Sequence, residues 1–167
     1  MNSIRQLMLS KSMKESPRSV SYRVSWPEPH THQFHVEVTF PGPLPETLDL
    51  RMPAWNPGSY LIREFSRHVS DVVAEGPGGE GCKVEQTAKD TWRIDQASKG
   101  VTVRYRVYAH ELTVRTSHLD ASHAFFNGVA LFLFSEECRT LPARLTLELP
   151  DEWRVSTGLE PAKGSEV

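Results

Sequence analysis

The stretch VTVRYRVY, residues 101–108, is the longest run in the chain over which apolar and polar residues alternate. Successive side chains of a β-strand point to opposite faces, so this pattern predicts a strand with one buried and one exposed face. Val101, Val103, Tyr105 and Val107 would lie on the buried face. No segment of ten or more residues shows a helical stripe of apolar residues, so we expect strands to build the whole fold.

Shorter segments on both sides of this stretch show the same strand pattern. The expected strands lie at residues 20–26, 34–40, 48–52, 68–74, 83–86, 92–95, 112–115, 144–149 and 153–155. Phe125-Phe126 and residues 129–134 are almost wholly apolar, and Asn127-Gly128 between them is a strong hairpin dipeptide. We therefore expect a hairpin there, covered on both faces. About ten short strands with regular turns predict an all-β fold, an antiparallel β-sandwich.

Length and composition suit one domain. The chain has 167 residues, and a domain of this size buries roughly 70% of its unfolded surface. We assign residues 20–159 to the β-sandwich, residues 1–19 to a flexible lead-in and residues 160–167 to a flexible tail. The two cysteines, Cys82 and Cys138, lie far apart and form no CxxC motif, which argues against a disulfide framework or a structural zinc site, although one long-range bridge stays open.

Charge and hydropathy argue against two classes of partner. The 19 Lys and Arg residues against 21 Asp and Glu residues give a net charge of -2, which provides no basic surface for nucleic acid. No apolar run approaches the roughly 20 residues of a membrane span, and the N-terminal apolar run is too short for a secretory signal. We expect no nucleic-acid or membrane partner and a cytoplasmic location.

The segment MPAWNPGSYLIREFSRHV, residues 52–69, differs from the alternating strands around it. Asn56-Pro57-Gly58-Ser59 predicts a turn, because proline suits the second turn position and glycine allows the positive φ of a type II turn at the third. Trp55 and Tyr60 flank this turn. They could plug the end of the sandwich, as large aromatic residues often do, or they could form a binding surface.

Fragments of known catalytic motifs occur, but none is complete. His110-Glu111 begins like the zinc signature HExxH, yet the fifth position is Val114 and the segment has a strand pattern. Ser117-His118-Leu119-Asp120 and Ser122-His123 contain the residue types of a catalytic triad, but a triad is defined by geometry, and a polar loop explains them better. We assign neither a catalytic residue nor a metal site in this chain.

Residues 53–69 closely resemble the hallmark segment of the glycyl aminopeptidase family, the zinc metallopeptidases of peptidase family M-sixty-one. A second match covers residues 105–115, followed by Phe125-Phe126-Asn127-Gly128. The resemblance covers roughly residues 20–159 and corresponds to the N-terminal β-domain of the family, which is similar to the N-terminal β-domains of other zinc aminopeptidases. In the family, a catalytic domain with HExxH and a PDZ domain follow. This chain stops before them, so it looks truncated.

The resemblance implies a non-catalytic role. It places the zinc cofactor in the catalytic domain rather than in this chain, which lacks HExxH and should be inactive alone. The expected partners are the catalytic domain of the same enzyme and the N-terminus of a peptide substrate, and the exposed docking face could also form a homodimer. The candidate substrate-binding residues are Trp55, Asn56, Gly58, Ser59, Tyr60, Arg63, Arg115 and Asn127.

Two other functions stay open at this point. A free-standing β-sandwich module that binds peptide or carbohydrate is the main alternative, since such folds often hold ligands on their loops. Metal storage by the histidines at positions 30, 32 and 35 is a more distant one, because histidines two apart in an extended segment share a face.

Overall fold

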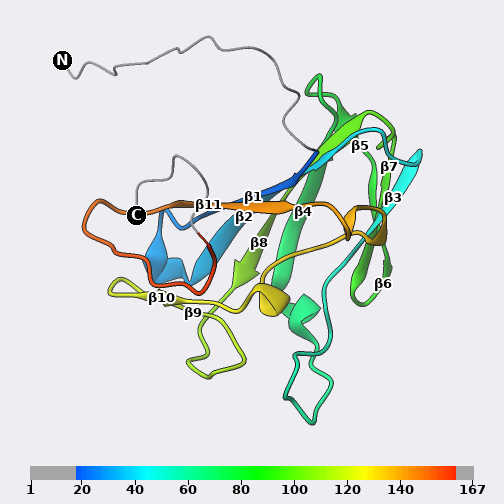
Figure 1. Ribbon diagram of the computed structural model, residues 1–167. Coiled ribbons are helices and arrows are strands. Elements are labelled where there is room, and N and C mark those ends of the chain that lie inside the picture. Colours follow the sequence, from blue (N-terminus) through cyan, green and yellow to red (C-terminus); the bar gives the residue numbers. More distant parts are fainter. Residues whose placement is uncertain (1–17, 161–167) are drawn as a thin grey trace, which may run out of the picture.

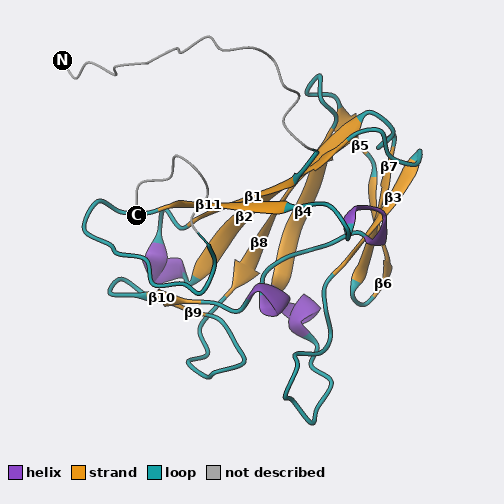
Figure 2. Cartoon of the chain, in the orientation of Figure 1, coloured by secondary structure: helices purple, strands orange, loops and turns teal. Residues whose placement is uncertain are grey.

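The computed structural model describes residues 18–160 as a predominantly β structure (Figures 1 and 2). Eleven strands and four short 3-10 helices lie in this part of the chain, which confirms the all-β prediction. Most of the predicted lead-in and nearly all of the predicted tail lie outside the described residues. Within residues 18–160, no helix is both long and apolar enough to cross a membrane.

Strand β8 (Gly100–Tyr108) is central to the larger sheet, in the order β11-β1-β2-β8-β4-β5. Its neighbours are β2 (Gln33–Pro41) and β4 (Val69–Glu75), both antiparallel to it. The predicted apolar face of β8 is buried, with Val101, Val103, Tyr105 and Val107 each at most 2% exposed. The alternation in residues 101–108 therefore identified both the strand and its inner face.

The remaining strands of this sheet are β1 (Val20–Ser25), β11 (Ala143–Glu148) and the short β5 (Gly81–Cys82). The first and last, β1 and β11, pair in parallel. The sheet is therefore mixed, and the prediction of a purely antiparallel sandwich was wrong for this pair, because strand patterning carries no information on direction.

The outer face of this sheet carries a row of alternating charges. Arg104 on β8 pairs with Glu37 on β2 and Glu75 on β4, each at 2.7 Å. Arg23 on β1 pairs with Glu148 on β11 at 2.8 Å and lies 3.7 Å from Glu37. All five side chains are at least about one third exposed, so each pair contributes little to stability. The row nevertheless keeps this face polar.

The inner face is covered by a second layer. It contains the antiparallel sheet β3-β7-β6, formed by β3 (Thr47–Arg51), β7 (Thr91–Asp95) and β6 (Val84–Ala88). Leu48, Leu50 and Ile94 of this sheet are fully buried and join the same core as the inner face of β8. Two layers around one hydrophobic core form the sandwich-like arrangement that the sequence predicts.

The apolar segment at residues 126–134 completes the second layer, but it is not the predicted hairpin. Asn127 and Gly128 form no hairpin turn, because Gly128 begins the 3-10 helix η3 (Gly128–Ala130). Phe134 exchanges backbone hydrogen bonds with Arg51 at the edge of β3. Tyr105 donates its hydroxyl to the Leu131 carbonyl at 3.0 Å and accepts from the Leu133 amide at 2.9 Å. The Tyr105 hydroxyl therefore makes hydrogen bonds that a neighbouring strand would make in the predicted hairpin.

Two other predicted strands are also absent from the described residues. Residues 112–115 form a turn, and residues 153–155 form an irregular segment after the turn at Asp151-Glu152. The strand expected at Phe125 is present as β10 (Ala124–Phe125), but it pairs with β9 (His118–Leu119). The 3-10 helix η2 (Phe65–His68) has no clear sequence pattern. Two further 3-10 helices are η1 (Pro29–Thr31) and η4 (Glu136–Cys138).

Candidate functional site

Several loops and short elements gather at one end of the sandwich (Figure 1). They are the loop at residues 53–64, which we call the NPG loop, the loop at residues 110–117, the β9-β10 hairpin, η2 and η3. Most of the sequence-predicted site residues lie on these elements. Loops held by a rigid scaffold often carry function, so this end is the candidate functional site.

The NPG loop contains the predicted turn. Ser59 donates its amide to the Asn56 carbonyl at 3.0 Å, and Gly58 has φ +84°, as the type II turn requires. Trp55 donates its indole N–H to the Ser59 carbonyl at 2.9 Å. The Arg63 amide donates to the Ala54 carbonyl at 2.6 Å and closes the loop. These internal bonds define one conformation for the loop.

The large side chains of the NPG loop point away from the core. Trp55 is 51% exposed, Tyr60 is fully exposed and Ile62 is 80% exposed. Leu61 is also exposed, as are Leu112 and Val114 on the neighbouring loop. Trp55 and Tyr60 therefore do not plug the sandwich, and the alternative of an exposed apolar surface fits the structure.

Gly58→Ala is expected to lower the free energy of unfolding by about 1–2 kcal/mol, because a residue with a Cβ is strained at this positive φ. A Cβ at Gly58 would meet no atom within 4 Å, so the effect would come from the backbone alone. Gly81→Ala is the matched control, since a Cβ there also meets open space and no positive φ applies. Urea unfolding would measure both, and equal effects would contradict the assignment of strain to Gly58.

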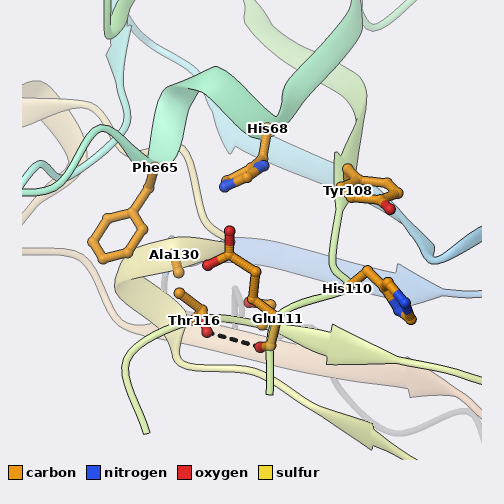
Figure 3. Close-up of a pocket in the computed structure, with 8 residues that line it drawn as sticks. Phe65, His68, Tyr108, His110, Glu111, Thr116 and Ala130 are labelled. Atoms are coloured by element: carbon orange, nitrogen blue, oxygen red, sulfur yellow. Dashed lines mark hydrogen bonds between the residues drawn. The ribbon is translucent and has the colours of Figure 1, made fainter. Parts of the chain in front are cut away.

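A small hollow lies between η2, the end of β8 and the loop at residues 110–117 (Figure 3). His68 and Glu111 face each other across it, and Arg67 donates to the Glu111 carboxylate at 3.4 Å. Burial, together with the Arg67 charge, lowers the pKa of His68, although Glu111 opposes the shift. His68 is therefore neutral near pH 7 and accepts from Arg67 Nε at 3.0 Å.

The other predicted site residues are used in different ways. Arg63 lines a groove of about 340 Å³ beside the NPG loop, and its buried Nε has no hydrogen-bond partner. The Ser59 hydroxyl donates to the Leu61 carbonyl. Asn127 caps η3, because its Oδ1 accepts from the Val129 amide at 3.3 Å. Arg115 lies on the loop at residues 110–117 and is partly exposed.

The structure brings only some of these residues into contact. The bonds above lie within the NPG loop, which contains Trp55, Asn56, Gly58, Ser59 and Arg63. Within residues 18–160, no hydrogen bond or ion pair joins that loop to Arg115 or Asn127. The predicted set is therefore a loop cluster at one end of the domain and not a single binding pocket.

Sequence reasoning missed a cluster of histidines beside these loops. The rings of His32 and His110 lie 3.7 Å apart between centroids, those of His110 and His118 5.7 Å, and those of His118 and His123 4.8 Å. An isolated antiparallel bridge holds His110 and His118 side by side. The available signal was the two histidines, the aspartate and the serine within positions 118–123, which the sequence analysis assigns to a polar loop.

The catalytic fragments in the sequence do not assemble into catalytic sites. His110 lies at an isolated β-bridge and not on a helix, so this segment does not form an HExxH zinc site. Ser122 Oγ and Asp120 Oδ1 both approach Nδ1 of His123, at 2.9 and 3.3 Å. A triad needs the serine and the acid at opposite ring nitrogens, so this arrangement is not one.

The three histidines near the start of β2 do not form a metal site either. His30 is exposed on η1, and His32 stacks on His110. Within the described residues, the only group of three or more side chains that could share a metal is His118, Asp120 and His123.

Comparison with known proteins identifies the family. The family described as the peptidase M61 N-terminal domain matches residues 21–167. The chain belongs to this family. The resemblance based on residues 53–69 and 105–115 is thereby confirmed, and the M61 N-terminal domain is the N-terminal β-domain of a peptidase.

One solved structure agrees with this assignment. The M61 N-terminal domain is similar to a crystal structure of an aminopeptidase N family protein from Idiomarina loihiensis, with 38% sequence identity, a TM-score of 0.74 and coverage of 80% of this chain. The present chain spans only 22% of that protein chain. An M1 zinc metallopeptidase from Deinococcus radiodurans also matches, with 13% identity and a TM-score of 0.39 over 78% of this chain and 31% of its own. No curated protein matches the chain.

Proposed function

We propose that this M61 N-terminal domain is a non-catalytic part of a zinc aminopeptidase. It packs on the catalytic domain and forms one wall of the pocket that receives the N-terminus of a peptide substrate. The family assignment and the similarity to an aminopeptidase N family protein support the parent activity. The zinc ligands and the general base would lie in the catalytic domain, where the metal would activate the attacking water.

The exposed apolar surface of the loop end is the observation that carries this proposal. Tyr60, Leu61 and Ile62 are each more than 60% exposed on the NPG loop, and Leu112 and Val114 are as exposed on the loop at residues 110–117. Exposed apolar side chains on a domain's loops suit surfaces that contact a partner. The outer face of the large sheet is covered by ion pairs instead, so the loop end is the better docking surface.

The individual residues of the loop end suit different parts of this role. Trp55 and Tyr60 would supply the apolar wall, with Trp55 held in place by its bond to Ser59. Asn56 and Asn127 offer amide groups for hydrogen bonds to substrate. Arg63 has a buried Nε without a partner, which suits a carboxylate from the catalytic domain better than Arg115 does.

Trp55→Ala in the full peptidase is expected to raise KM for a peptide substrate about tenfold, which corresponds to about 1.4 kcal/mol. Removing the ring deletes apolar contact area, while the domain loses little stability because Trp55 is half exposed. Steady-state kinetics and thermal unfolding on the same preparation would measure both quantities.

Val73→Ala is the matched control, because Val73 is 52% exposed but lies on β4 away from the NPG loop. Its KM should equal that of the unsubstituted enzyme. A lower Tm with unchanged KM for Trp55→Ala would show that the ring only supports the fold of the loop.

A further inference from the structure

His118, Asp120 and His123 bring three ligand atoms within 4.8 Å of one another on the β9-β10 hairpin. His118 Nε2 lies 3.1 Å from Asp120 Oδ2, and His123 Nδ1 lies 3.3 Å from Asp120 Oδ1. Ligands of a tetrahedral zinc ion lie about 3.3 Å apart, given zinc–ligand distances of about 2.0–2.2 Å. The three ligand atoms, which lie within 4.8 Å of one another, would have to approach further on metal binding.

The Asp120 carboxylate is already held in position. Its Oδ1 accepts from the Ser122 amide at 2.7 Å, the Ser122 hydroxyl at 2.7 Å and the His123 amide at 3.0 Å. The Ser122 hydroxyl is the largest of the interactions that lower the pKa of Asp120, so the carboxylate is ionised at pH 7. Oδ2 receives none of these three bonds and faces His118. Metal-binding carboxylates are commonly oriented by hydrogen bonds of this kind.

His118 would supply a largely buried ligand. The residue is only 8% exposed, and its Nδ1 is buried without a hydrogen-bond partner. If the proton is on Nε2, Nδ1 is a buried acceptor with no donor. If the proton is on Nδ1, Nε2 and the carboxylate are two acceptors facing each other at 3.1 Å. In the first form Nε2 donates to Asp120 Oδ2. Nδ1 has no protein partner in either neutral form, and a metal at Nε2 would not provide one, but a cation at Nε2 would remove the repulsion in the second form.

We infer that His118 Nε2, the Asp120 carboxylate and His123 Nδ1 bind a late first-row divalent metal ion of the Zn²⁺ class. Imidazole nitrogens favour such metals, whereas Mg²⁺ and Ca²⁺ prefer oxygen ligands. Three protein ligands leave one tetrahedral position for water, and the exposed ring of His123 gives solvent access to it. This inference does not depend on the proposed role in the peptidase, because it concerns ligands within this domain.

Zinc binding to the metal-free 167-residue chain would test the inference. After dialysis against EDTA, competition with a chromogenic chelator should show one Zn²⁺ per chain, and Mg²⁺ should not compete. Co²⁺ should give the intense visible absorption of a tetrahedral site. His123→Ala should weaken zinc binding at least tenfold, and it should fold, because this ring is half exposed.

His30→Ala is the control, because His30 is an exposed histidine outside the cluster. Its zinc affinity should be unchanged. Asp120→Asn provides a second variant with the same expected loss, and circular dichroism verifies that each variant is folded. Failure of the unsubstituted chain to bind zinc, or equal affinities for His123→Ala and the unsubstituted chain, would overturn the inference.

Discussion

Tyr105→Phe is expected to lower the free energy of unfolding by about 2–4 kcal/mol. The substitution removes one hydroxyl and leaves the Leu131 carbonyl and the Leu133 amide without their partner. An unsatisfied buried polar group costs about 1–3 kcal/mol, and the substitution leaves two such groups. Burial also raises the pKa of Tyr105, so the hydroxyl remains a donor throughout the working pH range. Urea unfolding with a linear fit would measure the effect.

Tyr22→Phe is the matched control for this result. Its hydroxyl donates only to the Leu133 carbonyl, at 2.9 Å, and it is only partly buried. The expected cost is about 1 kcal/mol, typical of a single hydrogen bond. If the two variants unfold at the same urea concentration, the Tyr105 hydroxyl does not support the segment at residues 131–133 in the way described.

Phe34→Ala is expected to destabilise the domain by about 3–5 kcal/mol, the range for removing a fully buried aromatic ring. Phe34 has no exposed surface. It packs edge-to-face against Trp26 and Phe126, with ring centroids 5.6 and 5.5 Å apart. The loss therefore combines transfer of the ring to solvent, a cavity and two aromatic contacts.

Phe125→Ala is the control for Phe34→Ala, because it removes a partly exposed phenylalanine instead of a buried one. Phe125 is 42% exposed on β10, so its replacement should cost less than about 1 kcal/mol. Thermal unfolding of both variants gives the comparison. A similar fall in Tm for the two would contradict the location of the main core beneath β2 and β8.

Strands that bury one face and expose the other were predictable from sequence. Residues 101–108 show this, because alternation directly records which side chains face the core. The turn at Gly58 was also predictable, since proline and glycine restrict the backbone locally. The apolar run at residues 129–134 was not, because burial by itself does not determine whether a backbone is paired by a strand or by the Tyr105 hydroxyl.

The candidate site was predictable only where it depends on local chemistry. The residue types at positions 118–123 were visible in the sequence, but the stacking of His118 on His110 depends on a backbone bridge formed by the loop between them. Asn127 illustrates the opposite error. An Asn-Gly pair favours a hairpin, yet the Asn127 side chain caps a helix here because the following residues turn inward to the core.

The parallel pairing of β1 with β11 has a consequence for how this domain is made. Residues 20–25 leave the ribosome early, but their partners at residues 143–148 are among the last residues of the domain to be synthesised. At about 5–20 residues per second, the outer edge of β1 stays unpaired for roughly 6 to 25 seconds. An open strand edge can pair with another chain. The nascent domain is therefore most prone to aggregate just before residues 143–148 emerge.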